Sequence, residues 1–295
     1  MDVGKRLLDL ARAAGAQSLA VVGTSKNAGK TVALAAVCDA LQRAGTSFGL
    51  CSIGRDGESA DALDAVAKPR YFLRPGAVAA TASTLVPAHP ACELLECSAE
   101  RSALGPIVLV RARAAGYLEV AGPPAAAALR RIARALATRT GFVLIDGAVD
   151  RIAALRDGDD AIVVAVGTAA PTPAHAVDDV RALVARLRLP EVDPTREALR
   201  IDGALSAAQA ADLVRAGERR QIVVADPTRI AFGGRPFSAL AAKLDLRVAR
   251  CLRPIACTVA PRGAERAFEP RAFLEAVARA TGLPAFDVYA GAEAA

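Results

Sequence analysis

A glycine-rich loop near the N-terminus contains the residues with the most specific chemistry. Ser18 to Thr31 reads SLAVVGTSKNAGKT, in which an apolar run ends at Gly23 and Gly29-Lys30-Thr31 opens a helical pattern. Backbone N–H groups at the start of a helix have no partner within the helix and point toward an anion. A lysine and a hydroxyl group at the same place add a cation for phosphates and an oxygen ligand for Mg²⁺. The order of strand, loop and helix therefore predicts a phosphate-binding loop.

Each residue type in this loop has an expected role. Gly29 lets the backbone approach the phosphates, Lys30 reaches the β and γ phosphates, and Thr31 offers its hydroxyl to Mg²⁺. Lys26 adds a second cation that could stabilise charge on a transferred phosphoryl group, unless it is a solvent-facing loop lysine. The residues expected to bind the nucleotide are Gly23, Thr24, Ser25, Asn27, Ala28, Gly29, Lys30 and Thr31.

Two aspartates are candidates for the metal side of the same site. The apolar run Phe142–Ile145 ends at Asp146, a Walker-B-like carboxylate that could hold Mg²⁺ or its water. Asp56 follows another expected strand, where the loop of a P-loop fold lies beside the γ-phosphate, although Asp-Gly also favours a plain turn. The expected metal ligands are Thr31, Asp146 and Asp56, and the candidate catalytic residues are Lys30, Lys26 and Asp56.

Other reactive residue types give weaker indications. Asp226, Thr228 and Arg229 follow an expected strand, where α/β folds place ligands, but an ordinary loop explains them equally well. Asn27 is the only asparagine, so an Asn-Lys-x-Asp guanine-recognition motif cannot form, which favours ATP over GTP. The six cysteines form no CxxC pair, so we expect reduced thiols.

The elements that must position these residues alternate along the chain. Short apolar runs alternate with helical segments, which predicts an α/β fold with a mostly parallel sheet flanked by helices. Strands are expected near Ser18–Gly23, Phe48–Ile53, Ile107–Arg111, Phe142–Asp146, Ala161–Gly167, Leu199–Ala204, Gln221–Asp226, Ile255–Ala260 and Phe286–Ala290. Helices are expected near Lys30–Ala44, Pro124–Thr138, Thr172–Leu187, Ala207–Gly217, Pro236–Leu244 and Pro270–Thr281.

Length and charge limit the remaining possibilities. The chain has 295 residues, and two prolines with mixed charge break the pattern over 187–199. This stretch is either an ordinary long connection or a seam, and a seam predicts a nucleotide-binding domain over 1–190 and an α/β portion over 198–295. The net charge of +6 is spread evenly and lacks interleaved aromatic residues, so we expect no nucleic-acid partner. The longest charge-free run, Pro75–Cys92, contains three prolines, and Asp2 and Asp9 interrupt the N-terminus. We therefore expect a cytoplasmic protein with no membrane span and no signal peptide.

The loop also resembles that of a known class. Five residues separate Gly23 from Gly29, and GTSKNAGKT is similar to the GTDTxxGKT loop of dethiobiotin synthetases, with Ser25 and Lys26 in place of Asp and Thr. The ordered set GTSKNAGKT, SIGRDGE, KPRYFLRPGAVAATA, LIDGAVDR, VVADPTRIAF and FDVYAG resembles the KamB-like ATPase subunit of the lysine 5,6-aminomutase reactivase. In that family DPTKIF stands where this chain has DPTRIAF, and an Asn-Pro stands where it has Val259-Ala260-Pro261.

This resemblance implies a P-loop NTPase that binds Mg-ATP and helps a cobalamin-dependent aminomutase to release damaged cofactor. The expected partners are such an aminomutase or its accessory ATPase, and members of the class often work as homodimers. A γ-phosphate with Mg²⁺ could order the Asp56 loop, and hydrolysis would release it. Two alternatives stay open at this point: an ATP-dependent small-molecule ligase or kinase of the dethiobiotin synthetase-like class, and a binding module without catalysis.

Overall fold

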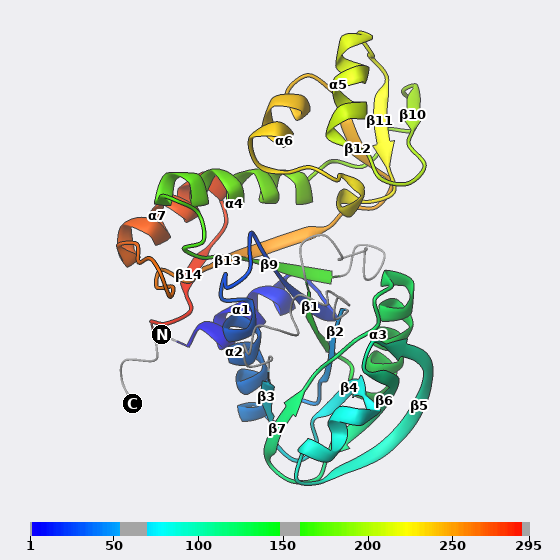
Figure 1. Cartoon of the computed structure of the whole chain (residues 1–295), viewed down its shortest axis with the longest axis vertical. Helices are drawn as coiled ribbons and strands as arrows, with labels where there is room; N and C mark the ends of the chain where they lie inside the picture. The colour runs from blue at the N-terminus through cyan, green and yellow to red at the C-terminus, as the bar shows by residue number, and fades with distance from the viewer. Residues whose placement is uncertain (1, 54–69, 148–159, 291–295) are drawn as a thin grey trace. The chain divides into compact units, whose positions relative to one another are not determined.

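The computed structural model of the chain describes residues 2–53, 70–147 and 160–290 (Figure 1). The chain folds into two compact units. The first contains Met1–Val21 and Lys30–Leu155, and the second contains Val22–Gly29 and Arg156–Ala295. Each unit has the α/β character predicted from the alternating pattern, with strands flanked by helices. The strand pairs of the first unit are partly parallel and partly antiparallel, and those of the second are parallel.

The first unit is built on a mixed sheet in which β1, β8, β2 and β4 are parallel and β6 and β5 are antiparallel additions. The strand order is β1-β8-β2-β4-β6-β5. Their bounds are β1 Ser18–Gly23, β8 Val143–Asp146, β2 Gly49–Ser52, β4 Val78–Ala82, β6 Gly105–Ala112 and β5 Cys92–Ser102. A separate antiparallel pair joins β3 (Arg70–Leu73) to β7 (Gly116–Glu119).

Three α-helices and a short 3-10 helix accompany this sheet. They are α1 Val3–Ala13, α2 Lys30–Arg43, α3 Ala126–Thr140 and the 3-10 helix η1 Ser83–Ala88. The apolar residues of α1 recur at helical spacing and are buried, and Gly4 lies so close to α2 that a Cβ there would be 2.0 Å from the Ala36 carbonyl oxygen. Contacts of α3 with β2 and β4, and of α2 with β8, cover the parallel strands.

The second unit contains two sheets. In the first, β9 (Asp160–Val166), β13 (Arg253–Val259) and β14 (Ala285–Asp287) are parallel, with α4 (Pro173–Leu187) and α7 (Pro270–Thr281) packed on them. The second sheet has the order β10-β11-β12 and its own apolar core. The strands of this sheet are β10 Ala198–Arg200, β11 Gln221–Val224 and β12 Leu246–Val248. The helices in the same part of the chain are α5 Ala207–Arg215, η2 Pro227–Arg229 and α6 Gly234–Ala241.

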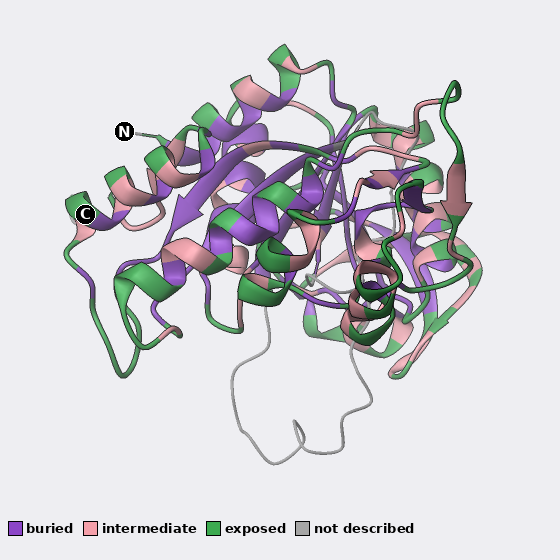
Figure 2. Cartoon of the chain, turned by 90° about the horizontal axis from the view of Figure 1, so that it is seen from above, coloured by how far each residue is buried: buried purple, intermediate pink, exposed green. Residues whose placement is uncertain are grey.

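The burial pattern explains why these segments form these elements. All residues of β1, β2, β4 and β11 are buried, as expected for apolar strands covered on both faces. Figure 2 shows helices that are buried along one side and exposed along the other. Within residues 2–53, 70–147 and 160–290, no helix combines the length and the apolar character that crossing a bilayer requires.

Every strand and helix expected from the sequence is present, with ends that shift by a few residues. The sequence did not predict α1, β3, β4, β5, β7 or β12. The expected seam at 187–199 lies within the second unit, between the end of α4 and the start of β10. The small β10-β11-β12 sheet begins at Ala198, while the division into domains at 190 and 198 stays a prediction.

Candidate functional site

The loop after β1 has an unusual backbone. Residues Thr24–Gly29 belong to the second unit, where the Thr24 N–H donates a hydrogen bond to the Ala165 carbonyl oxygen at 3.0 Å. Asn27 has a φ of 58°, and it is the only non-glycine residue with positive φ in the described part of the chain. Gly29 also lies in the left-handed region, with a φ of 84°. Residues with such φ values let a loop turn its N–H groups toward one point, as anion-binding loops do.

Close packing holds this loop in place. A Cβ at Gly29 would lie 3.0 Å from the Ala260 Cβ and 3.4 Å from a Val288 methyl group. A Cβ at Gly167 would lie 2.9 Å from the Ala28 Cα, and Ala28 itself is 1% exposed. The backbone after β9 therefore supports the loop directly, with no side chain between them. Sequence alone identifies Gly29 as special but not Gly167.

The first residues of α2 follow in the first unit. Lys30 and Thr31 open this helix, and its first turn contains no acidic side chain that would compete with a bound anion. Lys30 is partly buried, and burial lowers the pKa of its ammonium group, while the charge of Asp146 opposes that effect. The charge of Asp146 thus acts on Lys30, and the roles of both residues in a phosphate and metal site stay predictions.

Asp146 lies at the carboxyl end of β8, between two parallel strands. Its register partners are Val21 on β1 and Ser52 on β2. Burial raises the pKa of Asp146 above its ordinary value, and the hydrogen bond from Tyr71 and the charge of Lys30 act in the opposite direction. The carboxylate of Asp146 therefore lies in a buried environment with one hydrogen-bond donor and the charge of Lys30 acting on it.

Tyr71 is a site residue that the sequence did not reveal. Its hydroxyl donates a hydrogen bond to the Asp146 Oδ2 at 2.8 Å. Its side chain is 1% exposed, and burial together with the Asp146 charge raises its pKa well above the ordinary value. No local pattern in the sequence marks this residue, although a buried tyrosine hydroxyl usually has a hydrogen-bond partner.

Not every predicted site residue can be placed. Asp56 lies outside the described residues, so its catalytic and metal roles stay predictions. Lys26 and Asn27 are exposed in the loop, whereas Thr24, Ser25 and Thr31 are partly buried and Gly23 is buried.

Asp226 has a local structural role. It is 1% exposed, accepts hydrogen bonds from the Thr228 backbone N–H and hydroxyl group, and pairs with Arg250 at 3.5 Å. These contacts start the short helix η2, so the residues after β11 satisfy one another. In the described part of the chain all six cysteines are free thiols.

The donor set of the site suits Mg²⁺. Thr31 offers a hydroxyl oxygen and Asp146 a carboxylate oxygen, and magnesium prefers such hard ligands, few from the protein and the rest from phosphates and water. Among the described residues, no group of three or more histidines, cysteines or acidic residues could hold a metal by itself.

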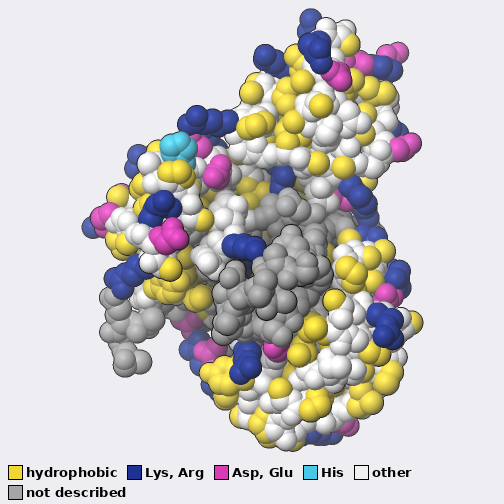
Figure 3. All heavy atoms as spheres, viewed as in Figure 1, with side chains coloured by type: hydrophobic (Ala, Val, Ile, Leu, Met, Phe, Trp, Pro, Cys, Tyr) yellow, Lys and Arg dark blue, Asp and Glu magenta, His cyan; other side chains and the backbone are white. Residues whose placement is uncertain are grey.

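The face of the molecule in Figure 3 shows no second candidate site marked by charge, because basic and acidic side chains of the described residues are interspersed on it.

Comparison of the chain with protein-family models, curated proteins and solved structures finds no significant match. The function of the chain is therefore inferred from its own residues and contacts.

Proposed function

We propose that the chain is a Mg-ATP-binding P-loop ATPase that serves as the reactivating factor of a cobalamin-dependent aminomutase. The observation that carries the nucleotide part is the placement of Lys30 and Thr31 at the start of α2 and of Asp146 at the end of β8, with the charge of Asp146 acting on Lys30. One lysine, one hydroxyl group and one carboxylate at these places are the parts that phosphoryl-transfer sites share.

The residues divide the work of such a site. The N–H groups of the loop and of the start of α2 would bind the phosphates, and Lys30 would neutralise charge on the β and γ phosphates. Thr31 and Asp146 would hold Mg²⁺, which supplies charge neutralisation between the phosphates. ATP is preferred over GTP because the only asparagine, Asn27, lies in the loop itself and leaves none for guanine recognition.

The reactivase part of the proposal is supported by the resemblance of the motif set to the KamB-like family. Its physical content is a switch: a bound γ-phosphate favours one conformation, and hydrolysis removes the contacts that hold it. An ATPase of this kind should turn over slowly alone and faster with its aminomutase partner. A ligase or kinase would instead consume ATP in step with a small acceptor molecule.

The deciding experiment measures Mg-ATP and Mg-GTP binding by calorimetry and phosphate release with and without a cobalamin-dependent aminomutase. Wild type should bind Mg-ATP, and Lys30→Ala should abolish binding. Mg-ATP at a hundredfold excess over its Kd should stabilise the fold by about 2.7 kcal/mol. No Mg-ATP binding by wild type would refute the nucleotide proposal, and fast hydrolysis indifferent to the aminomutase would refute the reactivase proposal.

A further inference from the structure

The hydroxyl group of Tyr71 contacts Asp146, one of the residues that the proposed function assigns to the metal. It donates to the Asp146 Oδ2 at 2.8 Å, across 75 positions of sequence. Asp146 belongs to β8 and Tyr71 to β3, so a second strand of the first unit contributes to the site.

The direction of this hydrogen bond follows from the chemistry of the two groups. An ionised carboxylate only accepts, so the Tyr71 hydroxyl is the donor. The carboxylate has further lone pairs, so Asp146 can accept from Tyr71 and still offer an oxygen to a metal ion.

The position of Tyr71 is fixed by its strand. β3 alternates exposed and buried residues, so Tyr71 points inward while Arg70 and Phe72 are exposed. The strand pairs with β7, where Tyr71 is opposite Leu118. A residue so placed, at 1% exposure, cannot swing into solvent without opening the β3–β7 pair.

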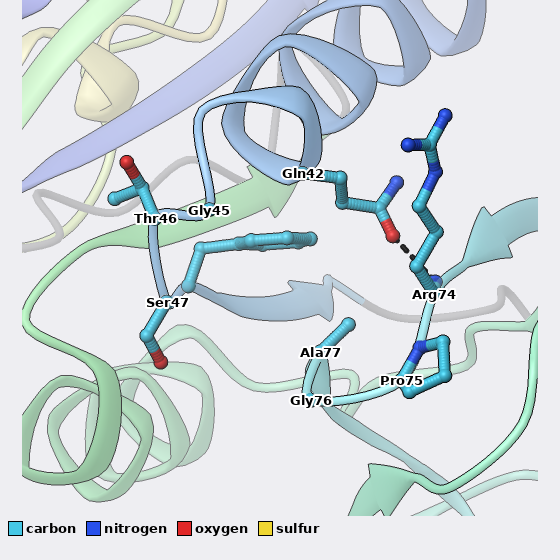
Figure 4. A pocket seen from close by; sticks show the side chains of 9 residues that line it. Gln42, Gly45, Thr46, Ser47, Arg74, Pro75, Gly76 and Ala77 are labelled. Atoms are coloured by element: carbon cyan, nitrogen blue, oxygen red, sulfur yellow. Dashed lines mark hydrogen bonds between the residues drawn. The ribbon is translucent and has the colours of Figure 1, made fainter.

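A side chain from α2 fixes the other edge of β3. The Gln42 amide donates to the Phe72 carbonyl oxygen at 3.1 Å and accepts from the Arg74 N–H. Figure 4 shows Gln42 directed at the Arg74 backbone, beside a cavity of about 180 Å³. The helix that opens with Lys30 and Thr31 therefore also holds the strand that carries Tyr71.

We propose that Tyr71 is a positioning residue of the metal site, which orients Asp146 and stays in place when Mg²⁺ binds. The inference rests on the proposed function, because it assigns a role at the same site. Tyr71 is not a ligand itself in this arrangement. It acts through the groups that touch the metal, as outer-shell partners of metal ligands do.

The test compares Tyr71→Phe with Tyr117→Phe. The second variant removes the same hydroxyl group from an exposed tyrosine on β7, the neighbouring strand. Calorimetry measures ATP affinity in EDTA and with increasing Mg²⁺. Tyr71→Phe should leave ATP affinity in EDTA unchanged and weaken the apparent Mg²⁺ affinity about 10- to 100-fold. Tyr117→Phe should behave as wild type in both.

Tyrosine fluorescence tests the same proposal in a protein that keeps Tyr71, so it does not require the Tyr71→Phe variant to fold. The chain has three tyrosines and no tryptophan, so Tyr117→Phe with Tyr289→Phe leaves Tyr71 as the single emitter. Its emission should stay protected from acrylamide before and after Mg-ATP is added. A second variant, Gln42→Ala, should lower Mg²⁺ affinity by a smaller factor because it loosens β3 without touching Thr31 or Asp146.

The outcomes separate the two proposals. Binding of Mg-ATP by wild type together with unchanged Mg²⁺ affinity in Tyr71→Phe would overturn the positioning role and leave the proposed function intact. Exposure of Tyr71 to acrylamide on Mg-ATP binding would also overturn it, since the residue would then have left the site. Failure of wild type to bind Mg-ATP would refute the proposed function, and the positioning role with it.

Discussion

Gly167 packs directly on the backbone of Ala28, and a Cβ in place of its hydrogen would lie 2.9 Å from the Ala28 Cα. The same Cβ would lie 3.0 Å from the Asn27 carbonyl oxygen. Backbone atoms cannot yield as the end of a flexible side chain can. Gly167, the residue directly after β9, therefore sets the position of the loop that is proposed to bind phosphates.

Gly167→Ala should displace this loop. We expect a loss of about 1–3 kcal/mol in the free energy of unfolding, which is typical of overpacking. Nucleotide affinity should fall further than stability alone explains, because the loop N–H groups would no longer converge. Thermal unfolding and Mg-ATP calorimetry measure the two effects separately.

Gly233→Ala is the matched control. Gly233 is exposed, its φ is −141°, and the nearest atom to an added Cβ is 4.0 Å away. It should change stability by less than about 1 kcal/mol and leave Mg-ATP affinity unchanged. Equal loss of nucleotide affinity in both variants would contradict the support role of Gly167.

The two lysines of the loop region should differ in what they contribute. Lys30 is partly buried and interacts with Asp146, whereas Lys26 is exposed. Lys30→Met should weaken Mg-ATP binding about 100-fold or more, because it removes a charge that pairs with the phosphates in a partly dry site. Binding of Mg-ATP with near wild-type affinity would exclude this role.

Lys26→Met should leave Mg-ATP affinity within a factor of about three and lower kcat about 10-fold or more, if Lys26 stabilises charge in the transition state. Steady-state hydrolysis gives KM and kcat separately. A variant with unchanged kcat would identify Lys26 as a solvent-facing loop residue.

The sequence could reveal Lys30, Thr31 and Asp146 because each lies in a local pattern of strand, loop and helix. Tyr71 could not be found in this way. Its hydrogen bond joins residues 75 positions apart, and it depends on the pairing of β3 with β7 and on the Gln42 contacts. Gly167 was missed for the same reason, since its close neighbour is a loop far back in the sequence.

The antiparallel strands of the first sheet were also difficult to predict from the sequence. β5 contains Glu93, Glu96 and Glu100, and most of its residues are only partly buried, so it has no apolar run. Its charges are matched by arginines on other elements, among them Arg111 on β6 and Arg139 on α3. Such pairing across elements is a property of the folded chain, whereas the apolar runs of β1 and β9 are evident from the sequence.

Exposed cysteines should react with thiol reagents faster than buried ones. Cys97 is exposed, whereas Cys38 and Cys257 are buried. Burial raises the pKa of Cys38 to about 12 and that of Cys257 to about 11, because a low dielectric disfavours the thiolate. Both therefore remain neutral thiols between pH 7 and 9, and the thiolate is the reactive form.

Ellman's reagent should accordingly show a fast phase that Cys97→Ser removes. Cys38 and Cys257 should stay unlabelled over this pH range and react only when denaturant unfolds the chain. Mass spectrometry of peptides after labelling identifies each site. Labelling of Cys38 in the folded protein at pH 7 would contradict the burial of α2 against its neighbours.

Arg186 should contribute strongly to the stability of the second unit. It is 6% exposed, and its Nη1 donates to the carbonyl oxygens of Ile230 at 3.1 Å and Phe232 at 3.3 Å. These bonds tie α4 to the segment between η2 and α6. Arg186→Met keeps most of the buried volume but leaves two carbonyl groups without this charged donor, which should cost about 1–3 kcal/mol.

Arg181→Met is the control on the same helix, because Arg181 is exposed and pairs only with Asp178 within α4. An exposed pair of this kind contributes about 0.3–0.5 kcal/mol. Urea unfolding followed by circular dichroism should therefore show a clear decrease in the midpoint for Arg186→Met and almost none for Arg181→Met. Equal midpoints would show that methionine packing compensates for the lost hydrogen bonds, as can happen where a buried charge is costly to desolvate.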